Sequence, residues 1–359
     1  MTKLLFFIFS MIIISSLPQK AISQLNYVKE IRQTSVAFIN SLNAEQKKTA
    51  LLSFKDSARE KWNNLPVGLR PRAGLSVGRM NDDQRKLLHR ILSVSLSSQG
   101  YLKATSIMHL DNLLNDFYDS LYYRKTISDT VLRNMQNLKW GHRHFYLAFF
   151  GQPSDSVWGY KVEGHHLSIN FSFVKNKLSV TPFFIGTDPA EYPIGEYSGW
   201  RVLGQEEDLG IKLIHLLSPA LQKKAIISND VPKDIITSAE SGKRLIDYQG
   251  VKGGEMTNEQ KAILQYIIRE FVFNMEYEKA VIEYNKIIKA GIDKVYFAWI
   301  GPMDEYKRHY FVLNGPTFLI EFDNSGFGGG ANHIHAIWRE KGNEYGEDVL
   351  KLHYQTEKH

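Results

Sequence analysis

Helical and strand-like patterns occur in separate blocks along this chain of 359 residues, and this arrangement constrains the fold more than any other feature. Between residues 24 and about 140, apolar residues recur at helical spacing, as in the helix predicted to begin after the capping residue Asn81 and to stop at Gly100. From Phe145 onward, alternation such as that in residues 167–173 indicates half-buried strands. Blocks of this kind favour an α+β fold over alternating β-α units.

The second half of the chain repeats the change from helices to strands. Helices are predicted over residues 206–217, 257–271 and 276–290, followed by strands at 295–300, 309–313, 317–323 and 333–339. We find no internal repeat and no linker. The chain is therefore predicted to form one domain over residues 24–359, in which a helical layer from residues 24–140 packs on a mainly antiparallel sheet within residues 141–359.

The first 23 residues have the pattern of a secretory signal peptide. Lys3 precedes an apolar stretch that stops at Ser15, which is too short to span a bilayer comfortably, and Ala21-Ile22-Ser23 suits a cleavage site. We expect cleavage after Ser23 and a periplasmic or secreted protein that has no integral membrane segment after the signal is removed.

The amino-acid composition excludes several kinds of site and one class of partner. Because the chain has no cysteine, it can form neither a disulfide nor a cysteine-ligated zinc site, and it has no thiol nucleophile or lipoprotein anchor. The formal charge of +6 comes from scattered lysines and arginines without interleaved aromatic residues, so we expect no nucleic-acid partner.

An ordered set of short segments resembles a secreted bacterial family known as domain of unknown function 3500. The residues that carry this resemblance are Trp62-x-x-Leu65-Pro66, Phe150-Gly151-Gln152-Pro153-Ser154, Trp158-Gly159-Tyr160-x-x-Glu163-Gly164-His165-His166, Phe297-Ala298-Trp299-x-Gly301 and Asn332-His333-Ile334-His335. The resemblance covers roughly residues 60–355. It implies export and a similar length, but it supplies no activity.

A His-x-His pair in a predicted strand is the clearest candidate for a site. His333 and His335 point to one face together with Arg339, opposite the apolar residues Ile334, Ala336 and Trp338. If residues 317–323 pair with this strand across the glycine-rich loop 326–330, the carboxylates of Glu321 and Asp323 join the same face.

By the same alternation, His166 lies on the polar face of the segment 158–174 and His165 is buried and hydrogen-bonded. We expect His166 and the pair His333/His335 to lie on neighbouring strands. The predicted metal ligands are therefore His166, His333, His335 and Glu321, with zinc favoured among divalent metals. His353 is a candidate for orienting a ligand from outside this set.

Three function classes remain open for these residues. The first is a metal-dependent hydrolase of a small polar or glycan-derived substrate, in which Arg339 or Glu163 assists charge or proton movement. The second is an extracytoplasmic protein that binds such a ligand without turnover, and the third is a copper or iron oxidoreductase. Purely structural histidines and metal-free acid-base chemistry are further readings of the same residues.

Two other motifs give weaker indications of a catalytic or binding site. Ser154 lacks the strand-Ser-helix elbow of a serine hydrolase. The glycine-rich loop is not followed by a Lys-Ser/Thr helix start, so we expect a flexible turn and no phosphate cradle.

Overall fold

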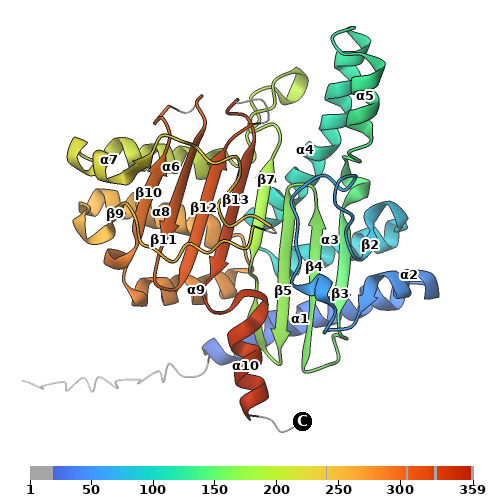
Figure 1. The fold of residues 1–359 in the computed structure, drawn as a ribbon. Helices are drawn as coiled ribbons and strands as arrows, with labels where there is room; N and C mark the ends of the chain where they lie inside the picture. The colour runs from blue at the N-terminus through green and yellow to red at the C-terminus, as the bar shows by residue number, and fades with distance from the viewer. Residues whose placement is uncertain (1–18, 240, 305, 327–329, 357–359) are drawn as a thin grey trace, which may run out of the picture.

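The computed structural model describes residues 19–239, 241–304, 306–326 and 330–356 (Figure 1). Most of the predicted signal peptide and residues 327–329 of the glycine-rich loop lie outside the described residues. Among the helices within them, none is both long and apolar enough to cross a bilayer.

The first half of the chain contains α1–α5 and β1–β7. Its helices are α1 (Gln19–Ser41), α2 (Ala44–Ala50), α3 (Asp82–Ser95), α4 (Ser98–Tyr123) and α5 (Asp129–Gln136). Its strands are β1 (Leu51–Leu52), β2 (Leu75–Ser76), β3 (Tyr146–Phe150), β4 (Val157–Gly164), β5 (Leu167–Val174), β6 (Lys177–Ser179) and β7 (Phe183–Thr187).

The second half contains α6–α10 and β8–β13. Its helices are α6 (Gly204–Leu216), α7 (Pro219–Ala225), α8 (Asn258–Val272), α9 (Tyr277–Ala290) and α10 (Glu347–Thr356). Its strands are β8 (Ile226–Ser228), β9 (Val251–Lys252), β10 (Tyr296–Ile300), β11 (His309–Asn314), β12 (Phe318–Asn324) and β13 (Ile334–Glu340).

All of these strands belong to one mixed, mostly antiparallel sheet, which confirms the α+β class. Its main order is β1-β3-β4-β5-β7-β13-β12-β11-β10-β8, with β2, β6 and β9 attached at the sides. The only parallel pairs among the described strands are β1 with β3 and β8 with β10. The β12–β13 hairpin forms as predicted, with Asp323 opposite His335.

The two halves repeat the same arrangement, contrary to the prediction of no internal repeat. Helices α1, α2, α3 and α4 correspond in order and position to α6, α7, α8 and α9, and strands β1, β2, β3, β4, β5 and β7 correspond to β8, β9, β10, β11, β12 and β13. The antiparallel pair β7–β13 joins the halves, and Phe183 faces Trp338 across this pair. Helices α3 and α8 even begin with matching capping boxes, Asn81/Gln84 and Thr257/Gln260.

One face of the sheet packs on helices from both halves. Trp158, Phe171, Trp299 and Trp338 are fully or almost fully buried there, in one core cluster with residues of α1, α3, α6 and α8. The helical layer therefore does not come from residues 24–140 alone. In addition, Gly100 does not end a helix: α3 ends at Ser95, and Gly100 lies in the first turn of α4, close to the backbone of Asn274.

The opposite face of the sheet carries buried polar residues such as Glu163 and Glu321 together with apolar ones such as Val312 and Leu319. Two long connecting segments, residues 53–74 and 229–250, cover it (Figure 1). Trp62 and Ile235 of these segments pack against Phe184 and Ile337. This second face is where the predicted site residues are found.

Candidate metal centre

His165 and His166 form the tight turn between β4 and β5. Gly164 and Leu167 are the last paired residues of this hairpin, and His166 has φ 59° in the left-handed region. Alternation does not continue through a turn, so the strand argument used for His166 does not apply. His165 is nevertheless buried, and its Nδ1 lies 2.6 Å from Asp111 Oδ1, as expected for a buried and hydrogen-bonded histidine.

His333 immediately precedes β13, and His335 lies within it. Ile334 and Ala336, which alternate with them, are fully buried in the core on the helical side of the sheet. The prediction that the two histidines share a face opposite these apolar residues is confirmed.

The strand β7 separates His166 from His335, so the prediction of neighbouring strands is wrong. Gly186 of β7 pairs with His335, and its N–H donates to the carbonyl of His166 over 2.7 Å. A Cβ at Gly186 would lie 3.0 Å from Cδ2 of His166 and 3.1 Å from Cδ2 of His335. The two rings can approach each other because the residue between them has no side chain.

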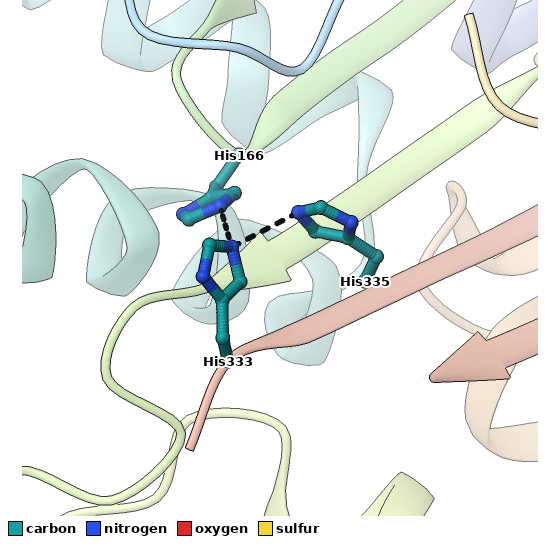
Figure 2. A group of neighbouring side chains, drawn as sticks. All are labelled: His166, His333 and His335. Atoms are coloured by element: carbon teal, nitrogen blue, oxygen red, sulfur yellow. Dashed lines mark hydrogen bonds between the residues drawn. The ribbon is translucent and has the colours of Figure 1, made fainter. Parts of the chain in front are cut away.

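Three imidazole nitrogens converge over this glycine. Nε2 of His333 lies 2.7 Å from Nε2 of His166 and 3.1 Å from Nε2 of His335, and all three residues are buried (Figure 2). Zinc–nitrogen bonds of about 2.0–2.1 Å at tetrahedral angles place their nitrogens about 3.3 Å apart. The cluster therefore has nearly the geometry of three histidine ligands around one zinc ion.

Carboxylates lie on the outer side of two of these rings. Nδ1 of His335 is 2.8 Å from Asp234 Oδ1, and Nδ1 of His333 is 3.7 Å from Asp188 Oδ2. A carboxylate that accepts the Nδ1–H leaves the Nε2 lone pair available for a metal. The ring of His166 stacks on His165, with centroids 3.7 Å apart.

Burial sets the protonation of the cluster. Burial, together with the neighbouring imidazoles, holds the pKa values of His166 and His333 well below the usual value for histidine. Burial also acts to lower the pKa of His335, but the Asp234 and Asp323 carboxylates outweigh it and raise that pKa. Two rings are therefore neutral at pH 7, the form that binds a metal.

Asp188 and Asp323 are unusual carboxyl groups. Burial raises the pKa of Asp188 to about 6 and that of Asp323 to about 7. Asp323 Oδ2 is buried, lies 3.9 Å from Nδ1 of His335 and has no hydrogen-bond partner among the residues that the structure describes. The carboxylate that reaches the cluster from β12 is therefore Asp323.

Glu321 does not join the histidines. Its carboxylate accepts hydrogen bonds from the Ile236 N–H at 2.6 Å and the Tyr310 hydroxyl at 2.9 Å. Glu321 lies two residues before Asp323, so the rise of about 3.3 Å per residue places it roughly 7 Å further along the strand. There it holds the covering segment 229–250.

Arg339 and Glu163 also lie outside the cluster. Arg339 donates to the Thr237 carbonyl at 2.6 Å and pairs with Glu344 at 2.6 Å, beside a separate cavity. Glu163 accepts from the Asn63 N–H at 2.6 Å and lies 3.6 Å from Arg72. Both residues hold covering segments in place and do not line the histidine cavity. The side chain of His353 lies outside the described residues.

Little in the sequence indicates that Asp188 and Asp234 belong to the site. Both lie in irregular connecting segments, where no periodicity predicts the direction of a side chain. Their partners are 145 and 101 residues away in sequence, so only the folded chain brings them to the histidines.

The cluster opens into a cavity of about 370 Å³ at the junction of the two halves. This cavity is lined by Asn64, Leu65, Pro66, His165 and His166 from the first half, and by Lys233, Asp234, Arg308, Ser325, Gly326, His333 and His335 from the second. The volume is suitable for a small molecule.

A family model with the description "Protein of unknown function (DUF3500)" matches residues 24–347, which include the whole cluster. No curated protein and no solved structure matches the chain.

Proposed function

Because the chain belongs to the DUF3500 family, whose description assigns no activity, we propose a function from the site itself: a metal-dependent hydrolase that acts on a small polar or glycan-derived substrate. The observation that carries this proposal is the convergence of the Nε2 atoms of His166, His333 and His335 at the wall of a cavity. Three histidines with a fourth position open to water are a known ligand set for catalytic zinc.

The donor set fits zinc. It contains three imidazoles, no thiolate, and carboxylates at Nδ1 of His333 and His335 that would orient the ligands. When bound at such a site, zinc polarises a substrate carbonyl and lowers the pKa of a bound water. Asn64 Nδ2 lies 3.4 Å from Nε2 of His335 and lines the cavity, so it is a donor for a substrate oxygen.

The proposal includes export from the cytoplasm. The short apolar stretch at residues 4–14 supports it, and so does the family match, which begins at residue 24, directly after the predicted cleavage site.

Metal content is the first test. Protein purified without a histidine tag or a chelator should contain zinc, as measured by elemental analysis. His333→Ala and His335→Ala should each abolish stoichiometric binding and the metal-dependent hydrolysis of p-nitrophenyl esters or glycosides, because each removes one of three ligands. His215→Ala, at an exposed position on α6, is the matched control and should keep the metal.

Ile334→Ala distinguishes metal loss from misfolding. Its side chain is fully buried, so truncation should cost on the order of 2–5 kcal/mol of unfolding free energy while folded protein retains the metal. If the histidine variants bind metal like wild type, or if all three variants merely unfold, the proposed function fails. Copper or iron in place of zinc would favour the oxidoreductase, and absence of any metal would favour the binding protein.

A further inference from the structure

We propose that the histidine cavity selects ligands that carry an anionic group, a carboxylate or a phosphate, and that Lys233 and Arg308 bind this group. The inference rests on the proposed function in that it names the substrate class for the same cavity. Both side chains line the cavity beside His333 and His335.

Arg308 is held in a fixed orientation with donors left over. One terminal nitrogen of its guanidinium group donates to the carbonyls of Val231 at 3.3 Å and Pro232 at 3.2 Å. Its Nε is buried and has no hydrogen-bond partner within the described part of the chain. A guanidinium group that is fixed by neutral carbonyls keeps its full charge, and its other terminal nitrogen, which has no hydrogen bond to a described residue, is left for a ligand.

Lys233 brings a second positive charge. It is exposed at the rim of the cavity, and its backbone carbonyl accepts a hydrogen bond from the Ser325 hydroxyl at 3.3 Å, which fixes the segment that carries it. Among the described residues, neither Lys233 nor Arg308 forms an ion pair, and the neighbouring Asp234 is engaged by His335. The cavity therefore presents two positive charges without ion-pair partners among the described residues, beside one carboxylate, Asp234, that is hydrogen-bonded to His335.

The second cavity, of about 360 Å³, provides an internal comparison. Its buried Arg339 is paired with Glu344, and the Lys341 ammonium donates to Asn314 Oδ1 and to the carbonyl of Gly315 at 2.7 Å. The two cations that face that cavity from β13 and the residue after it are thus already satisfied by protein groups. The histidine cavity differs in that its guanidinium, Arg308, has no acidic partner among the described residues, whereas Arg339 is paired with Glu344.

The guanidinium group of an arginine and the ammonium group of a neighbouring lysine together recognise carboxylate and phosphate oxygens. Because the cations and the histidines line one small cavity, the anionic group of the ligand and the bond to be hydrolysed would belong to the same small molecule.

The test measures binding of acetate, inorganic phosphate and the neutral acetamide to the zinc-loaded full-length mature protein by isothermal titration calorimetry. We expect at least one of the two anions to bind about tenfold or more tightly than acetamide, and the stronger of the two identifies the preferred group. Lys233→Met and Arg308→Met should each weaken anion binding about tenfold without changing metal content.

Lys243→Met is the matched control, because Lys243 is exposed on the same covering segment but does not line the cavity, and it should bind anions like wild type. Arg308→Lys keeps the charge and serves as a check on folding, with partial recovery of binding expected. Equal binding of acetate, phosphate and acetamide, or wild-type anion binding by the Met variants, would overturn the inference, since the anions would then contact the metal alone. Measuring metal content in every variant separates this failure from failure of the proposed metal site.

Discussion

At the scale of single residues, His166 and His333 stand out because burial keeps both neutral. Their pKa values in the folded protein lie well below that of an unfolded histidine, which is about 6.5. Below pH 6.5 the unfolded chain therefore takes up protons that these folded residues do not. By linkage, the stability that they contribute is present above pH 6.5 and is lost as the pH falls toward their folded pKa values.

The loss of stability with falling pH has a measurable slope. In chelator-treated protein, each of the two histidines should lower the free energy of unfolding by up to about 1.4 kcal/mol per pH unit below pH 6.5. Urea unfolding at pH 7.5 and pH 5.5 should show a smaller loss for His166→Gln than for wild type. The raised pKa of His335 acts in the opposite direction in both proteins, so the comparison isolates His166. An identical loss in both would show that His166 is protonated in the folded protein.

The shared face of His333 and His335 was predictable, but the position of His166 and most of the partners of the three histidines were not. A His-x-His pair in an alternating segment fixes which side chains share a face, and this holds for His333 and His335. Alternation also places Glu321 and Arg339 on that face, yet it does not show which residues of the face the covering segments contact. Asp234 reaches His335 only because the segment 229–250 folds back over the sheet.

At the scale of elements, β7 decides whether the site can exist. This strand lies between β5 and β13, and Gly186 is its residue between the rings of His166 and His335. The alternating pattern predicted the strands β5 and β13. It did not predict β7 between them, because the order of strands depends on pairing between distant segments.

Gly186→Ala should damage the site although it replaces none of the three histidines. The new Cβ would lie 2.7 Å from the carbonyl oxygen of Ile334, so β7 or β13 must shift, and the rings at about 3 Å must move apart. We expect zinc affinity to fall about tenfold or more, with a loss of about 1–3 kcal/mol in unfolding free energy. Competition with a chromogenic chelator measures the first quantity and urea unfolding the second.

Gly254→Ala is the control for this variant. A Cβ there would meet its nearest neighbour, the Asp293 carbonyl oxygen, at 3.4 Å, an ordinary contact. Zinc binding by Gly186→Ala that equals that of the control would mean that the rings do not need the space above Gly186.

At the scale of the whole molecule, removal of the leader should leave the packing intact. Helix α1 begins at Gln19, before the predicted cleavage site, and its described core residues, such as Tyr27, Val28 and Ile31, lie after that site. Protein exported with its own leader should start at Gln24, and its thermal midpoint should equal that of residues 1–359 expressed with the leader retained. Intact-mass spectrometry and calorimetry check these outcomes, and retention of residues 1–23 in the exported protein would contradict the prediction.

The repeated arrangement of the two halves was invisible in the sequence because it is carried by topology and by scattered positions, such as the capping boxes of α3 and α8. Many apolar side chains satisfy the same buried position, so two segments can fold alike with few identical residues. The class of fold was predictable from local patterns, whereas the symmetry required the pairing of β7 with β13.

Because the two halves belong to one chain, the site does not depend on the protein concentration. Two separate copies of a half would have to meet in solution, and a centre shared between them would be lost on dilution. Here one chain supplies His166 from one half and His333 and His335 from the other, so the cluster persists at any protein concentration. The turn between β11 and β12 corresponds to the turn that carries His166. A second cluster cannot form there, because the register of β12 and β13 places Lys341 at the position that corresponds to Gly186. Two like halves thus give one asymmetric centre per molecule.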